Sequence, residues 1–284
     1  MKESIRVAAV QWSPAWLEPE QNRDRMADKV REVGPDVDLV VFPELSTTGY
    51  VTGRDREFGG ELVAASERLD GPSTQLLQQA ARETGCQVVF GLSELHPVLP
   101  ATLYNSAVML SADGSIAGVH RKLHIPVDEK HFYLEGESAE VFDTSLGCFG
   151  LSICYDNWFP ELWRRYALAG AEVIVSPINA HLTGDAGRLF MHELPRVRAF
   201  ENRCFVVACN RIGTEIRGET RRTYSGLSGI YDPFGDALAL AEGDEETVLI
   251  AALELKTLNE ARTWLPVFRD RRPDLFGSAA QADR

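Results

Sequence analysis

One stretch of the sequence decides the fold: Gly150-Leu151-Ser152-Ile153-Cys154-Tyr155-Asp156-Asn157-Trp158-Phe159-Pro160-Glu161. Its apolar first half predicts a β-strand. Its second half predicts the start of an α-helix, because Asp156 or Asn157 can cap a helix and Pro160 suits a first helical turn. Cys154 would then lie at a strand-to-helix corner, where the backbone amides of the helix start point toward whatever its sulfur attacks. The question is whether this thiol is a nucleophile or a small buried apolar group.

The composition limits the classes of function. The chain has 284 residues, 44% of them hydrophobic and 25% charged, which is ordinary for a globular protein with a large core. A formal net charge of -13 would repel nucleic acid over most of the surface. The first apolar run is too short for a signal peptide or a membrane span, so we expect a cytoplasmic protein without membrane contact. The cysteines are odd in number and mostly lie inside apolar runs, which predicts reduced thiols: Cys86, Cys148, Cys154, Cys204 and Cys209.

Helical and strand patterns alternate from the start to about residue 210, and this alternation predicts an α/β fold. Strands are expected at 7–11, 38–42, 86–90, 173–177 and 204–210, and helices at 20–33, 73–84, 160–169 and up to about 202. The stretches 106–110 and 115–120 flank Ala112-Asp113-Gly114, which predicts an antiparallel hairpin and hence a mixed sheet. Residues 256–284 are charged and lack a strong apolar period. We interpret them as a C-terminal arm on the surface of a single domain, 1–284.

A nucleophilic thiol needs a base or a positive neighbour, since its unperturbed pKa is about 8.5. None of the six histidines lies in a context that compels a Cys-His pair. Glu44 ends the buried strand 38–42 much as Cys154 ends its own strand, and functional groups gather at the carboxyl ends of strands in mostly parallel sheets. Lys122 follows the strand 115–120 and could hold an oxyanion. The residues alone thus indicate a site formed by Cys154, Glu44 and Lys122.

Three separated segments resemble those of the nitrilase superfamily of carbon-nitrogen hydrolases. They are Phe42-Pro43-Glu44-Leu45 with Thr48-Gly49-Tyr50, then Arg121-Lys122-Leu123-His124-Ile125-Pro126, then Cys154-Tyr155-Asp156 with Phe159-Pro160-Glu161. The segments 210–213 and 270–275 are also similar to family segments, so the resemblance runs nearly end to end. It implies a four-layer α-β-β-α sandwich whose helices pair across a two-fold interface, giving a homodimer or a larger assembly of dimers.

The resemblance also implies the catalytic residues. The family triad of Glu, Lys and Cys corresponds to Glu44, Lys122 and Cys154. A second family glutamate precedes an aromatic pair, and Glu129 fits that place, with Asp128 and Glu135 as close alternatives. No metal or organic cofactor is needed.

The implied mechanism proceeds through a thioester. Glu44 takes the thiol proton and Cys154 attacks an amide-type carbonyl carbon. Lys122 and the backbone amide of Tyr155 hold the oxyanion, while Glu129 orients Lys122 or assists proton movement. Ammonia or an amine leaves, and water activated by Glu44 then hydrolyses the thioester.

The residues after the cysteine narrow the substrate. Cys154-Tyr155-Asp156 is similar to amidases, whereas nitrilases tend to show Cys-Trp-Glu. We therefore predict an amidase that hydrolyses a small neutral or cationic carboxamide. An N-carbamoyl amine hydrolase, which releases ammonia and carbon dioxide, is the alternative, because such enzymes resemble this chain in 124–126 and 158–161. A catalytically silent scaffold is the third hypothesis, and the complete triad disfavours it. The predicted substrate contacts are Tyr155, Asn157, Trp158 and Asn179.

Overall fold

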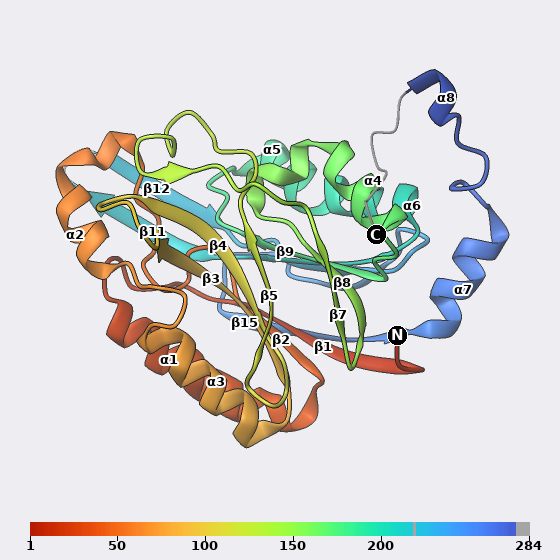
Figure 1. Ribbon diagram of the computed structural model, residues 1–284, viewed down its shortest axis with the longest axis horizontal. Helices are drawn as coiled ribbons and strands as arrows, with labels where there is room; N and C mark the ends of the chain where they lie inside the picture. Colours follow the sequence, from red (N-terminus) through yellow and green to blue (C-terminus); the bar gives the residue numbers. More distant parts are fainter. Residues whose placement is uncertain (218–219, 277–284) are drawn as a thin grey trace.

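Two β-sheets pack face to face at the centre of the molecule, and helices cover the outer face of each sheet (Figure 1). The protein is seen in a computed structural model that describes residues 1–217 and 220–276. The layers follow the order helix, sheet, sheet, helix. The predicted α-β-β-α sandwich with mixed sheets is confirmed.

The first sheet has the strand order β15-β1-β2-β3-β4-β5, with β6 paired to β4. Its strands are β1 (Ser4–Gln11), β2 (Leu39–Val41), β3 (Gln87–Leu95), β4 (Leu103–Leu110), β5 (Ile116–Arg121), β6 (Tyr133–Leu134) and β15 (Thr247–Glu254). The central strands β1, β2 and β3 are parallel, and β15, β4 and β5 are antiparallel to their neighbours. The pairing of β4 with β5 confirms the predicted hairpin.

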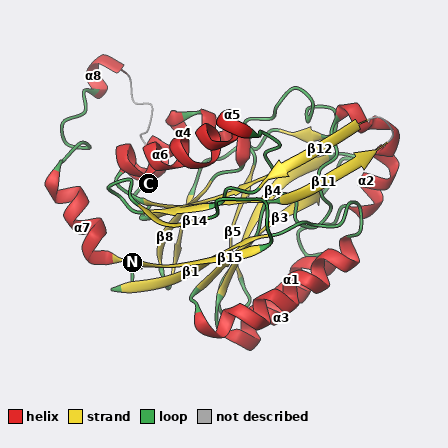
Figure 2. Cartoon of the chain, turned by 180° about the vertical axis from the view of Figure 1, so that it is seen from behind, coloured by secondary structure: helices red, strands yellow, loops and turns green. Residues whose placement is uncertain are grey.

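The second sheet repeats this plan with the order β14-β13-β10-β9-β8-β7. Its strands are β7 (Val141–Thr144), β8 (Gly147–Leu151), β9 (Val173–Ile178), β10 (Phe205–Asn210), β13 (Gly229–Tyr231) and β14 (Ala237–Leu240). Here β8, β9 and β10 form the parallel centre. A separate hairpin of β11 (Ile212–Arg217) and β12 (Thr220–Ser225) projects beyond the ends of the sheets (Figure 2).

Helices on both outer faces close the apolar layers. The helices are α1 (Pro19–Val33), α2 (Gly59–Ala65), α3 (Pro72–Thr84), α4 (Pro160–Leu168), α5 (Gly184–Arg188), α6 (Leu194–Asn202), α7 (Leu255–Trp264) and α8 (Pro273–Phe276), with short turns η1 (Gly34–Asp36), η2 (Gly53–Phe58), η3 (Cys154–Trp158) and the π-helical η4 (Leu189–Glu193). Helices α1 and α3 cover the first sheet, and α4 and α6 cover the second. Between the sheets, Val7, Phe149 and Val207 are fully buried. Each such side chain contributes roughly 1.5–3 kcal/mol by leaving water.

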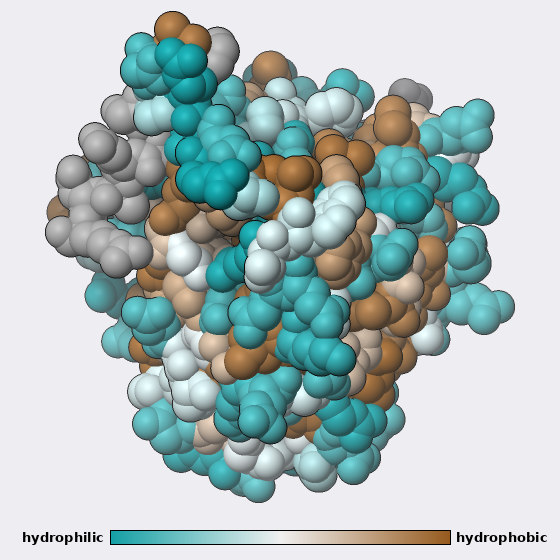
Figure 3. Space-filling view, turned by 90° about the vertical axis from the view of Figure 1, so that its right-hand side faces the viewer, coloured by the Kyte–Doolittle hydropathy of each residue, from teal (hydrophilic) through white to brown (hydrophobic). Residues whose placement is uncertain are grey.

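The C-terminal segment is more ordered than its sequence pattern predicts. Its first part is the helix α7, which buries Leu258 and Ala261, three positions apart, while Trp264 and Leu275 stay exposed. Only two apolar positions make the buried face, so no strong period marks it. Figure 3 shows this side of the molecule, where hydrophobic and hydrophilic side chains are interspersed. Residues 277–284 of the predicted arm lie outside the described residues. None of the helices in the described ranges has the length and apolarity that a membrane span requires.

Candidate active site

Cys154 lies at the predicted corner, three residues after the end of β8, and begins the 3-10 turn η3. Its backbone has φ of +45°, in the left-handed region that non-glycine residues rarely adopt. Such a conformation costs on the order of 1–3 kcal/mol and persists only where the surroundings hold it. The α-helix that follows, α4, begins at Pro160. The prediction that Asp156 or Asn157 caps it is wrong, because both lie inside η3 and the N-cap Phe159 has no side-chain cap bond.

Asp156, whose side chain is fully buried, holds the turn in place through hydrogen bonds to two histidines, and we call the three residues the aspartate-histidine cluster: Asp156, His120 and His124. Asp156 Oδ2 accepts from His120 Nε2 at 3.0 Å and from the Ile153 amide at 3.1 Å. Asp156 Oδ1 accepts from His124 Nδ1 at 2.7 Å and from the His124 amide at 3.0 Å. Burial alone would raise the pKa of Asp156, but the hydrogen bonds from His120 and His124 lower it well below its usual range. The ionised carboxylate thus ties the Cys154 turn to the end of β5.

Three further charged groups meet in a second cluster, the carboxylate-lysine cluster: Glu44, Lys122 and Glu129. Glu44 follows β2, Lys122 follows β5, and Glu129 lies on the loop before β6. All three residues are at most 1% exposed. Lys122 Nζ donates to Glu44 Oε1 at 2.7 Å and to both Glu129 carboxylate oxygens at 2.9 Å. Asn105 Nδ2 also donates to Glu44 Oε1, at 2.7 Å. Oε2 of Glu44 is buried and has no hydrogen-bond partner within residues 1–217 and 220–276.

The charges in this cluster and on Cys154 affect one another. Burial raises the pKa of the Cys154 thiol well above its ordinary value, and the carboxylate of Glu44 raises it further while Lys122 opposes the shift. Burial also raises the pKa of Glu44, against the lowering effect of Lys122 and with the support of Glu129. Burial lowers the pKa of Lys122, but Glu129 and Glu44 outweigh it and raise that pKa well above the ordinary value. At neutral pH the thiol is therefore protonated beside a carboxylate with unusual affinity for a proton.

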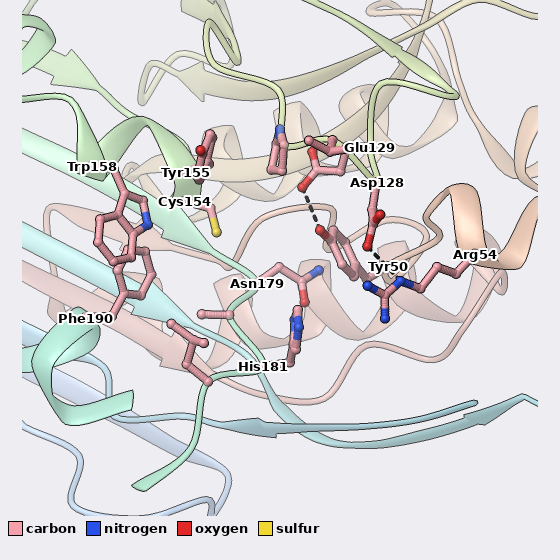
Figure 4. A pocket seen from close by; sticks show the side chains of 14 residues that line it. Tyr50, Arg54, Asp128, Glu129, Cys154, Tyr155, Trp158, Asn179, His181 and Phe190 are labelled. Atoms are coloured by element: carbon pink, nitrogen blue, oxygen red, sulfur yellow. Dashed lines mark hydrogen bonds and ion pairs between the residues drawn. The ribbon is translucent and has the colours of Figure 1, made fainter. Parts of the chain in front are cut away.

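A pocket of about 470 Å³ opens onto Cys154 (Figure 4). Its polar or charged lining residues come from four loops, with Arg54 and Asp128 joined by an ion pair of 2.9 Å. Trp158 stacks on Phe190 with ring centroids 5.4 Å apart and forms an apolar wall. The lining residues are Tyr50, Arg54, Pro126, Val127, Asp128, Glu129, Cys154, Tyr155, Trp158, Asn179, Ala180, His181, Leu182 and Phe190. A small molecule fits such a pocket.

Three of the four predicted substrate contacts line this pocket: Tyr155, Trp158 and Asn179. Asn179 has a buried Oδ1 without a partner. Asn157 does not line the pocket and requires a correction. It is 1% exposed, and its side chain bonds Ser152 Oγ and Ser176 Oγ at 2.6 and 2.9 Å. The tight 3-10 turn η3 directs Asn157 into the protein, whereas the predicted helix began only at residue 160 and left Asn157 before it.

The alternatives for the second glutamate are separated by position. Glu129 contacts Lys122, whereas Asp128 lies at the pocket mouth and Glu135 pairs with Lys130 at 3.0 Å on the surface. Sequence reasoning missed Tyr50 and Asn105, which bond the carboxylates. Tyr50 was inside a quoted family segment without a role, and Asn105 stood inside a strand pattern that carried no signal for a site.

Comparisons with known proteins identify the family of the chain. The family model for carbon-nitrogen hydrolase matches residues 6–263. A relative called citrullinase, from Francisella tularensis subsp. tularensis, is 37% identical over 291 residues, covering 96% of this chain and 97% of its own. A relative called nitrilase, from Pyrococcus abyssi, is 34% identical and covers 96% and 99%. The crystal structure of a carbon-nitrogen hydrolase from Helicobacter pylori G27 superposes with a TM-score of 0.86 at 28% identity, covering 97% and 98% of the two chains.

The fold and these relatives define a hydrolase that acts on carbon-nitrogen bonds. The chain belongs to the carbon-nitrogen hydrolase family of the nitrilase superfamily.

Proposed function

We propose that the protein is an amidase, a single hydrolase domain that converts a small carboxamide to a carboxylate and ammonia through a thioester on Cys154. The observation that carries the proposal is the buried pair of Glu44 and Lys122, 2.7 Å apart at the Cys154 pocket, in which Oε2 of Glu44 has no partner among the described residues and can take a proton. Lys122 is the neighbouring positive group.

Each step of the reaction has a group in place. Glu44 accepts the thiol proton as the sulfur of Cys154 bonds to the carbonyl carbon. Lys122 and the backbone amide of Tyr155 stabilise the oxyanion, and each such donor is worth about 10²–10³ in rate. Glu44 then returns the proton to the amide nitrogen as the carbon-nitrogen bond breaks and ammonia leaves. Glu44 next takes a proton from water as the water oxygen bonds to the carbonyl carbon, and it returns that proton to the sulfur of Cys154 as the carbon-sulfur bond breaks; the acid leaves as a carboxylate and gives its own proton to solvent.

The second candidate is hydrolysis of an N-carbamoyl amine. The relative called citrullinase favours it, because citrulline carries a carbamoylated amine. The same thiol attack on the carbamoyl carbon would release ammonia, and the remaining carbamate would break down to an amine and carbon dioxide. Arg54 and Asp128, which form an ion pair in the pocket lining, supply one positive and one negative group for the far end of such a substrate.

A substrate panel with a Cys154→Ala variant tests both candidates. Amides, N-carbamoyl amines and nitriles are scored by ammonia, and carbon dioxide is measured in parallel. We expect ammonia from the wild type and none from C154A, while Cys148→Ala, which removes another half-buried thiol, keeps full activity. Carbon dioxide along with ammonia selects the second candidate. Turnover by C154A, or a wild type silent on the whole panel, contradicts the proposal.

We also propose the homodimer that the family resemblance implies. The helical stretch from α5 to α6 exposes three large apolar side chains: Leu189, Val197 and Phe200. Such residues are typical of interface cores. Sedimentation velocity should give twice the chain mass, and a V197D/F200D variant should sediment as a monomer; a wild-type monomer at micromolar concentration contradicts this assembly.

A further inference from the structure

Two carboxylates share one ammonium in the carboxylate-lysine cluster. With Glu44, Glu129 and Lys122 all ionised, the cluster carries one excess negative charge in a buried site. It therefore has room for one additional proton, and the two carboxyl groups compete for it. The proposed chemistry requires that this proton goes to Glu44, and the charges alone do not decide between the two.

The hydrogen bonds are unequal. Glu129 receives Lys122 on both oxygens, at 2.9 Å each, and the Tyr50 hydroxyl on Oε1 at 2.6 Å. Glu44 receives its side-chain donors, Lys122 and Asn105, on one oxygen only, which leaves Oε2 free. Donors to the charged form of a carboxyl group favour that form. Glu129 is thus the carboxylate better stabilised as an anion.

Tyr50 is the donor that only Glu129 has. It is 6% exposed, and Figure 4 shows its ring in the cavity with the hydroxyl directed at Glu129. Burial raises the pKa of the Tyr50 phenol well above its ordinary value, and Glu129 and Glu44 raise it further. The phenol therefore stays protonated at neutral pH and acts as a donor. A separation of 2.6 Å is typical of a hydroxyl bonded to an ionised carboxylate.

We propose that Tyr50 is a positioning residue that assigns the two carboxylates their roles. By holding Glu129 in its ionised form, the Tyr50 hydroxyl leaves Glu44 as the group that takes the thiol proton. The inference rests on the proposed function, since it concerns the base of that same reaction.

Other titratable groups face the cluster and must be kept unchanged in any test. Cys154 approaches from η3 and Tyr133 from β6. Arg54, Asp128 and His181 line the mouth of the same pocket. Substitutions at Tyr50 leave all of these groups in place.

The test is the pH dependence of the Tyr50→Phe variant, which loses only the hydroxyl. A hydrogen bond to a charged group corresponds to about one to two pKa units, so Glu129 should then compete for the proton. The acid-side midpoint of kcat/KM should move up by about one unit, and kcat at neutral pH should fall about tenfold with KM within twofold. Alkylation of Cys154 by iodoacetamide, followed by peptide mass spectrometry, should show the same upward shift without any substrate.

The matched control is Tyr224→Phe, because the Tyr224 hydroxyl is buried like that of Tyr50 and also donates to a carboxylate, Glu215 Oε2 at 3.0 Å, which is not part of the cluster. Its midpoint should stay at the wild-type value. A Y50F profile that is lower at every pH with an unmoved midpoint, or a raised KM with unchanged kcat, overturns the inference.

A second variant separates this role from a loss of packing. In a Glu129→Gln background the second carboxyl group no longer titrates, so adding Y50F should not move the midpoint further. An additional shift contradicts the inference. Failure of the proposed function itself would appear elsewhere, as turnover by C154A or inactivity of the wild type on the panel.

Discussion

Two buried charged clusters flank the turn that carries Cys154, and they differ in how completely their oxygens are bonded. In the aspartate-histidine cluster, both Asp156 oxygens accept two hydrogen bonds each. In the carboxylate-lysine cluster, Oε2 of Glu44 accepts none. A buried oxygen without a donor costs stability, on the order of 1–3 kcal/mol. The aspartate-histidine cluster therefore stabilises the Cys154 turn, whereas the carboxylate-lysine cluster leaves one carboxylate oxygen available to accept a proton.

The difference also appears in the direction of the pKa shifts. Hydrogen bonds lower the pKa of Asp156 despite its burial, so it stays ionised. Burial raises the pKa of Glu44, which suits it to exchange a proton near neutrality. Equal burial thus gives opposite pKa shifts, because Asp156 accepts from two histidines while Glu44 has a second carboxylate, Glu129, beside it.

The largest expected effect is the loss of kcat in the Glu44→Gln variant. The amide keeps an oxygen for Lys122 and Asn105 but cannot take the thiol proton, so we expect kcat to fall by about 10³ with little change in unfolding free energy. Ammonia release and urea unfolding measure the two quantities. Glu135→Gln, on the surface, should be as active as wild type. A kcat of E44Q within tenfold of wild type would show that the free oxygen is not used.

Asp156→Asn should have the opposite balance of effects, with a large loss of stability and a smaller loss of activity. It replaces an acceptor of four hydrogen bonds by an amide with one acceptor oxygen, and we expect a loss of about 3 kcal/mol in unfolding free energy. The effect on kcat should be smaller than that of E44Q, because no group of the cluster exchanges protons with substrate. Asp113→Asn, in the exposed β4-β5 turn, is the matched control and should cost less than about 1 kcal/mol. Unchanged stability of D156N would contradict the supporting role.

The smallest expected effect is in the acid dependence of stability. The native pKa of Asp156 lies below its unfolded value of about 3.9, so its contribution is complete above that pH and is lost as pH falls below it. Wild-type unfolding free energy should therefore decrease from about pH 5 downward, and D156N should show a shallower decrease. Urea titrations at several pH values between 3 and 7 compare the slopes. Parallel curves would place the acid sensitivity in other carboxylates.

Much of the fold could be predicted because its signals are local. The helix ending at Gly85 follows from an apolar period and a glycine with φ of +71°, and the β4-β5 hairpin from its turn residues. Helix α7 was missed because two buried positions give no clear period. Asn157 was predicted to contact substrate, but it is buried inside the 3-10 turn η3. A 3-10 turn and an α-helix begin with similar residues yet direct their side chains differently, so the local sequence did not reveal this.

Of the site, the sequence identified the types of residue but not all their contacts. Glu44, Lys122 and Cys154 stand at ends of predicted strands, and family segments surround them. Asn105 lies within β4, where nothing local distinguishes an asparagine that donates to a carboxylate from one that packs.

The sequence by itself determined that a thiol follows an apolar strand at a corner, and which elements come before and after it, because residue periods and turn chemistry act over a few neighbours. Only the tertiary structure decided which groups meet that thiol. Tyr50, Lys122 and Glu129 come from different segments and converge because the strands before or after them are in one sheet, and they meet Cys154 of the other sheet because the two sheets pack face to face. The raised pKa values of Tyr50 and Lys122 follow from burial and from the carboxylates beside them, which come together only when the chain is folded.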